Sequence, residues 1–260
     1  MSNTYWQDRM AASQAKISAK SIKQIEKQLR QYYGNTMKYV ISDFERVYNQ
    51  VLAQQEEGKQ ITPALLYKLD SYWKLQGQLR QVLQSLGDKQ VSALSKILEI
   101  NFFDVYYSIN IEGLTAFTTL DKGSVAQLIN QVWVADGKSF SQRIWDNIER
   151  LMETLNEELV LCVAAGKKTT ELKQKLQERF GVSYNRADTL VRTEMAHIQT
   201  QAAQKRYEDY GIQKVQFWAD PDERTCDVCG KLHKKIYLVG EQMPIPAHAN
   251  CRCTILPVVE

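Results

Sequence analysis

Five residues near the C-terminus combine the side-chain types and the spacing that bind a metal ion. Cys226 and Cys229 are separated by two residues, and after a gap of eighteen residues the chain reads His248-x2-Cys251-x-Cys253. Zinc takes four thiolate or imidazole ligands in a tetrahedron, and two ligands two residues apart reach one ion from a tight turn. The spacing lies within the range of zinc knuckles and ribbons. The sequence therefore predicts a structural zinc site.

These residues offer five donors for four positions. The favoured ligand set has the same two-residue gap in both halves. It consists of Cys226, Cys229, His248 and Cys251. Cys253 is an alternative to His248, and His233 is a more distant one. The competing interpretation is that the cysteines are reduced thiols that pack as small apolar groups in a loop-rich tail.

Signals for catalysis are weak elsewhere in the sequence. Glu194 and His197 are one turn apart on an expected helix, but the second histidine of the HExxH zinc proteases is missing. We interpret them as a solvated or core-edge pair. The sequence has no glycine-rich phosphate loop and no local Ser/His/Asp set. We therefore expect a protein that is not an enzyme.

Composition places the chain among ordinary globular proteins. Hydrophobic residues make up 44% and charged residues 24%, so the chain can bury a core. It lacks the run of about 18 apolar residues that a membrane-spanning helix needs. Its start has no apolar stretch of the signal-peptide type, so we expect it to stay in the cytoplasm where it is made. Clustered cysteines in a cytoplasmic chain favour a metal over disulfides.

Helical periodicity covers the chain up to about residue 210. The expected helices lie at about residues 14–33, 41–52, 63–86, 91–107, 125–134, 144–163, 169–180 and 184–210. Glycine commonly ends a helix. Glycines at the expected helix ends are Gly34, Gly87, Gly166, Gly181 and Gly211.

The pattern changes after Gly211. Residues 214–218, 236–239 and 254–259 alternate or contain the residues typical of strands, and Pro257 restricts the last strand to an edge. The predicted fold class is mainly α. A long-helix N-terminal region is followed by a small α+β, zinc-stapled C-terminal module.

Positive side chains follow one face of the first expected helix. They are Lys16, Lys20, Lys23, Lys27 and Arg30, and we call them the basic stripe. Spacings of three and four residues place them opposite Ile22, Ile25 and Leu29. Such a stripe suits DNA phosphates or an acidic protein surface. The plainer alternative is a solvated helix face.

Several motifs, in the same order, resemble those of Mu F-like minor head proteins of bacteriophages. Residues 184–194 resemble the family's LxRTE helix, residues 222–229 its D-x-R-T-C-x-x-C turn, and residues 246–253 its P-x-H-x-N-C-R-C end. Residues 140–145 resemble its FSxRI helix, and residues 5–9 its YWxxR start. The resemblance is specific for about residues 125–260. The structural-motif residues that it implies are Arg192, Glu194, Trp218, Asp222 and Arg224.

One departure concerns the turn after the cysteine pair. The family usually has L-x-G there, whereas this chain reads Leu232-His233-Lys234. Some relatives also replace the cysteine pair, so the resemblance does not by itself require zinc.

The resemblance implies a structural minor head protein of a tailed bacteriophage, located in the virion at the capsid interior or portal vertex. It would act in capsid assembly near the portal, and in genome packaging or ejection. The implied partners are the portal protein and capsid or scaffold proteins, with genomic DNA as a further candidate. Residues 1–124 would form a helical region that contacts the portal, capsid or DNA, and residues 125–260 the head morphogenesis domain with the cluster at 226–253. The alternative is a zinc-containing DNA-binding protein without a virion role.

Overall fold

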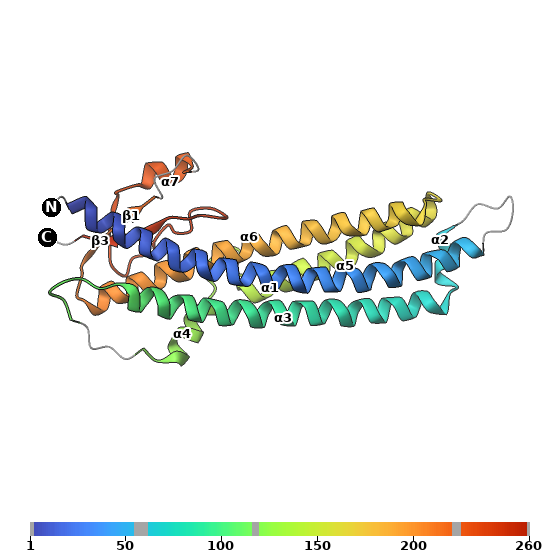
Figure 1. Cartoon of the computed structure of the whole chain (residues 1–260), viewed down its shortest axis with the longest axis horizontal. Helices are drawn as coiled ribbons and strands as arrows, with labels where there is room; N and C mark the ends of the chain where they lie inside the picture. Colours follow the sequence, from blue (N-terminus) through green and yellow to red (C-terminus); the bar gives the residue numbers. More distant parts are fainter. Residues whose placement is uncertain (1–2, 55–61, 116–119, 220–224, 259–260) are drawn as a thin grey trace. The chain divides into compact units, whose positions relative to one another are not determined.

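The computed structural model describes residues 3–54, 62–115, 120–219 and 225–258. Its helices are α1 (Asn3–Ala53), α2 (Pro63–Tyr67), α3 (Asp70–Ser108), α4 (Lys122–Ile129), α5 (Phe140–Ala164), α6 (Thr169–Asp209) and α7 (Asp227–Leu232) (Figure 1). Its strands are β1 (Lys214–Trp218), β2 (Ile236–Leu238) and β3 (Thr254–Pro257). The predicted class, mainly helical with a small α+β part at the C-terminal end, is confirmed. Among the described residues, no helix has both the length and the apolarity that crossing a membrane requires.

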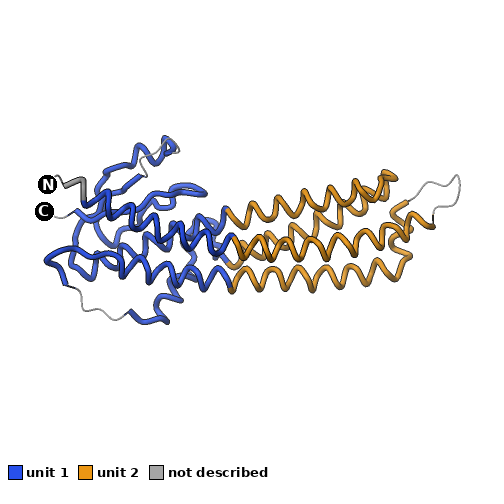
Figure 2. The backbone as a smooth tube through the Cα atoms, in the orientation of Figure 1, with its two compact units in different colours: residues 1–26, 93–140, 189–260 blue, residues 27–92, 141–188 orange. Residues whose placement is uncertain are grey.

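The chain forms two compact units, and each is assembled from segments that are distant in the sequence (Figure 2). Unit 1 contains residues 1–26, 93–140 and 189–260, and unit 2 contains residues 27–92 and 141–188. The boundaries of these compact units differ from the predicted division into residues 1–124 and 125–260. That division concerns functional regions and stays a prediction.

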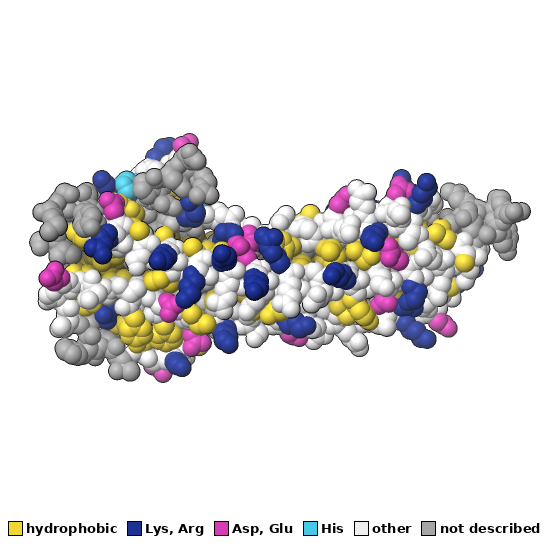
Figure 3. Space-filling view, in the orientation of Figure 1, with side chains coloured by type: hydrophobic (Ala, Val, Ile, Leu, Met, Phe, Trp, Pro, Cys, Tyr) yellow, Lys and Arg dark blue, Asp and Glu magenta, His cyan; other side chains and the backbone are white. Residues whose placement is uncertain are grey.

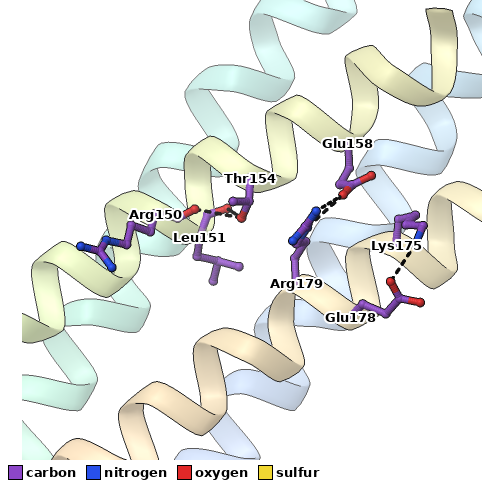
Figure 4. A network of polar contacts seen from close by, with 7 residues as sticks. All are labelled: Arg150, Leu151, Thr154, Glu158, Lys175, Glu178 and Arg179. Carbon is purple, nitrogen blue, oxygen red and sulfur yellow. Dashed lines mark hydrogen bonds and ion pairs between the residues drawn. The ribbon is translucent and has the colours of Figure 1, made fainter.

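Unit 2 is a helical bundle held together by apolar faces. Side chains three or four residues apart on each helix are buried, as in the series Leu172, Leu176 and Phe180 on α6. Polar contacts accompany this core. Arg179 on α6 donates two hydrogen bonds, of 2.9 and 2.5 Å, to Glu158 on α5 (Figure 4).

Three predicted helix ends are wrong, because α1, α3 and α6 continue through Gly34, Gly87 and Gly181. A glycine inside a helix costs about 1 kcal/mol relative to alanine, which a few buried apolar side chains on either side outweigh. The expected ends at Gly166 and Gly211 are confirmed. Both have left-handed φ values, +58° and +72°, which side chains other than glycine rarely adopt.

Gly87 is needed in α3 for a reason of packing. A Cβ atom at this position would lie 2.5 Å from the ring of Trp145 on α5, whereas at Gly34 it would meet no atom within 4 Å. We therefore expect Gly87→Ala to destabilise the protein by about 1–3 kcal/mol, since the indole must move. Gly34→Ala should instead stabilise it by about 0.5–1 kcal/mol through helix propensity. Chemical denaturation of both variants measures the difference, and a stabilised Gly87→Ala variant would contradict this packing.

Unit 1 contains an antiparallel sheet in the order β2-β1-β3. Val215 on β1 pairs with Tyr237 on β2 and with Pro257 on β3. The position of β3 at an edge agrees with the expectation from Pro257, which has no N–H to donate to a further strand.

A chain of buried polar side chains connects β3 to the helices of unit 1. Its members are Asn101, Ser18, Gln199, Thr254, Gln14 and Tyr207, which come from α3, α1, α6 and β3. Buried polar groups are costly unless they are paired, and a connected set favours one arrangement over others. The strand that follows the last cysteine is thereby fixed on α1 and α6.

Candidate metal centre

The first two cysteines are positioned by the start of α7. Cys226 directly precedes this helix, and its Sγ accepts a hydrogen bond from the backbone N–H of Cys229, at 3.4 Å. The helical turn therefore brings both thiols to the same side, with Cys229 buried and Cys226 half-buried. All the cysteines of this cluster are free thiols.

His248 and the last two cysteines reach the same point from the loop before β3. His248 Nε2 lies 3.2 Å from Cys226 Sγ and 3.3 Å from Cys229 Sγ, and Cys229 Sγ lies 3.8 Å from Cys251 Sγ. Two groups of donor atoms, each within 4.8 Å, share Cys229. They are Cys226, Cys229 and His248, and Cys229, Cys251 and Cys253.

These distances fit a tetrahedral zinc ion. With zinc–sulfur bonds of about 2.3 Å, two thiolates at the corners of a tetrahedron lie about 3.8 Å apart. The separation of Cys229 and Cys251 already has this value. Either group of three donors can hold a metal, and a fourth ligand from the other group must move towards the ion to complete the tetrahedron.

The imidazole of His248 is oriented for metal binding by its other nitrogen. His248 Nδ1 lies 2.7 Å from the carbonyl oxygen of Ala249, which can only accept, so Nδ1 carries the proton. The lone pair of Nε2 then faces the thiols. This is the arrangement by which a second hydrogen bond fixes the tautomer of a metal-binding histidine.

The thiols of the cluster differ in pKa, and therefore in how readily each becomes a thiolate. Hydrogen bonds, chiefly from the Cys253 thiol, lower the pKa of Cys251 to about 5. Burial raises the pKa of Cys229 to about 12, and donation to Cys251 raises the pKa of Cys253. The thiolate is the form that binds metals, so Cys251 is prepared as a ligand while Cys229 must lose its proton to the incoming ion.

The C-terminal part of the chain matches a known protein family. Residues 153–256 match the family described as Phage Mu protein F like protein. This segment is a Mu F-like domain. It begins within α5, contains α6, β1, β2 and β3 except for Pro257, and includes every donor of the cluster. No curated protein and no solved structure matches the chain. The match relates the chain to phage heads.

Which four of the five donors bind the metal stays a prediction. His233 has another place, because its Nδ1 accepts the backbone N–H of Ala219 at 3.2 Å and its ring contacts Trp218 edge-on, with 4.9 Å between centroids. Lys234 follows with φ +63°. The turn therefore keeps the left-handed conformation that favours glycine, although this chain has lysine there.

Three consecutive residues of α6 each bind a different segment of unit 1. Arg192 forms an ion pair with Glu26 on α1. The Thr193 hydroxyl accepts the backbone N–H of Asn250 at 3.2 Å, and a Glu194 carboxylate oxygen accepts the indole N–H of Trp133 at 3.0 Å. Sequence reasoning assigned no role to Thr193, although this residue is part of the LxRTE motif, and it missed Trp133, which has no local signal of its own.

Of the two alternatives for Glu194 and His197, a solvated or a core-edge pair, the solvated one is wrong. Only 3% of Glu194 and 7% of His197 is exposed. The ring of Trp133 stacks on His197 with 4.2 Å between centroids and covers it. Trp218, of the predicted motif, is buried in β1, whereas Asp222 and Arg224 lie outside the described residues.

The basic stripe lies on the solvent side of α1. All five of its side chains are exposed, and Ile25 and Leu29 are buried on the other side of the helix. Figure 3 shows several Lys and Arg side chains over α1. The predicted amphipathic pattern is present, and the partner of the stripe stays a prediction.

Proposed function

We propose that this chain is a structural minor head protein of a tailed bacteriophage, located in the virion, with one zinc ion in its Mu F-like domain. The observation that carries the proposal is the family match, which coincides with the part of the chain that contains the metal cluster. In this role the chain acts in capsid assembly near the portal, and in genome packaging or ejection. Its partners are the portal protein and capsid or scaffold proteins.

Zinc is proposed as the metal because the clustered donors are thiols and an imidazole, the ligands that zinc prefers. The segment from 225 to 250 also needs a crosslink such as a bound metal to be stable. Its buried side chains are Cys229, Met243 and Ile245 alone, while Val228, Ile236 and Leu238 are each more than half exposed. So few buried apolar groups supply little folding free energy, and bound metal replaces the missing core.

The proposed role is not enzymatic. A catalytic zinc keeps one coordination position for water, whereas this cluster offers five protein donors for four positions. Glu194, the acidic residue of the motif on α6, is buried and accepts a hydrogen bond from Trp133. The support is therefore for a metal that stabilises the fold.

The basic stripe supplies a test of the partners. Replacing its four lysines with glutamine should weaken binding of the purified chain to the portal protein of the same phage, because positive charges lose their acidic counterparts. A matched control replaces the exposed residues Lys68, Lys74, Lys89 and Lys96, which changes the net charge equally on other surfaces. Binding to the portal protein and binding to duplex DNA are both measured over a range of salt concentrations.

Three outcomes separate the interpretations. Weakened portal binding with an unaffected control variant supports the proposed docking. Loss confined to duplex DNA, with a steep dependence on salt, favours the alternative of a zinc-containing DNA-binding protein. A wild-type chain that binds neither portal nor capsid and scaffold proteins would refute the proposed function.

A further inference from the structure

The loop that supplies the second half of the metal cluster is fixed to α6 at two points. At its start, the backbone N–H of Asn250 donates to Thr193 Oγ1 at 3.2 Å. At its end, Gln199 Nε2 donates to Thr254 Oγ1 at 3.1 Å. Cys251 and Cys253 lie between these two points and are 3% and 5% exposed. The position of both thiols therefore depends on α6.

The Thr193 hydroxyl is oriented for this contact by its own helix. It donates to the carbonyl oxygen of Thr189 at 2.7 Å, so its lone pairs remain to accept the N–H of Asn250. Asn250 has φ +62° and lies inside the turn that separates His248 from Cys251, closed by a 3.2 Å bond from Cys251 N–H to His248 O. The hydroxyl thus contacts the turn between two metal donors.

The rotation of α6 at this place is also fixed. Arg192 and Glu194, the residues on either side of Thr193, bind Glu26 on α1 and Trp133 in the segment before α5. Neighbouring residues of a helix project about 100° apart, so these contacts hold the helix from different sides. The Thr193 hydroxyl therefore presents a stationary acceptor to the loop.

We infer that Thr193 is the positioning residue of the metal centre, which holds the turn from His248 to Cys251 in the geometry that zinc requires. The inference rests on the proposed zinc site and names a residue outside the ligand set. Removing a hydrogen bond that orients metal ligands lowers metal affinity by about 10- to 100-fold in other proteins. For a single neutral bond to a half-buried hydroxyl, we expect the lower end of this range.

The experiment compares four full-length proteins. Thr193→Val keeps the shape of the side chain and lacks the hydroxyl, whereas Thr193→Ser keeps the hydroxyl. Thr200→Val is the matched control, because the Thr200 hydroxyl makes the same bond to the residue four positions earlier, Ala196, at 2.9 Å in the same helix. Zinc affinity is measured by competition with a chromophoric chelator.

We expect zinc to bind roughly 10-fold more weakly to Thr193→Val, and as tightly as to wild type in the serine and Thr200→Val variants. Equal zinc affinity of Thr193→Val and wild type would overturn the inference about Thr193 and leave the proposed zinc site intact. Equal weakening in Thr200→Val would also overturn it, since helix stability would then be the cause. A wild-type chain that binds no zinc would overturn the proposed metal centre as well.

Hydrogen exchange gives a measurement without substitution. The amide of Asn250 should be protected in the zinc-loaded wild-type chain, because its N–H is bound to Thr193. Fast exchange of this amide in the loaded protein would contradict the positioning role even if a Thr193 variant failed to fold.

Discussion

Replacing Cys229 with serine is expected to remove zinc from the chain and to unfold residues 225–253. Cys229 is the donor shared by both groups of candidate ligands, and only 2% of it is exposed. Zinc binding supplies about 10–16 kcal/mol of folding free energy in small zinc domains, and this segment has little apolar core to replace it. The effect should exceed that of any single apolar truncation in the unit.

The measurement is elemental analysis of protein purified without a metal-binding tag, with circular dichroism before and after chelation. Wild type should contain one zinc per chain. Cys253→Ser is the matched control, because it removes a buried thiol of the same cluster that lies outside the favoured ligand set, and it should keep its zinc. Zinc lost from Cys253→Ser and retained in His248→Ala would instead establish a four-cysteine site. Substoichiometric zinc with an intact fold would refute the metal centre.

The cluster could be predicted from the sequence because its chemistry is local. Two cysteines two residues apart already determine a turn with converging thiols, and α7 begins at this turn. The edge position of β3 could be predicted for the same kind of reason, since the missing N–H of Pro257 is a property of one residue. Such features need no knowledge of what packs against them.

The helix lengths could not be predicted from local signals. A glycine has a similar helix propensity at Gly34, Gly166 and Gly181, yet only Gly166 lies at an end. The difference is whether buried apolar side chains continue beyond the glycine, and burial contributes more than about 1 kcal/mol of propensity. Gly87 adds a tertiary cause, because its missing Cβ makes room for Trp145, 58 residues away.

The partners of the motif on α6 could not be predicted from the sequence either, because they are distant from it along the chain. Arg192 binds Glu26 across a separation of 166 residues, and Glu194 binds Trp133 across 61. The helical period indicates that neighbouring residues face different directions, but it does not say what lies in each direction. Burial of Glu194 and His197 follows from Trp133, which no pattern near residue 194 indicates.

Acid is expected to destabilise the protein through His197, by about 3 kcal/mol between pH 7 and pH 4. Burial lowers the pKa of His197 from 6.5 to about 4, although a hydrogen bond with the backbone of Ile245 opposes this shift. One pKa unit corresponds to about 1.4 kcal/mol. Between the two pKa values the unfolded chain binds a proton that the folded chain does not. Stability is therefore complete above about pH 6.5 and is lost as the pH falls towards 4.

The measurement compares the free energy of unfolding of wild type and His197→Gln across this range. Glutamine does not titrate, so the variant should lose about 3 kcal/mol less than wild type on acidification, whatever its stability at pH 7. Protonation of the metal ligands contributes equally to both proteins and cancels in the difference. Parallel curves would contradict the prediction, as would an NMR titration of the His197 imidazole with a midpoint near 6.5. Either result would mean that Trp133 leaves this ring open to water, so the stacking on α6 would not persist in solution.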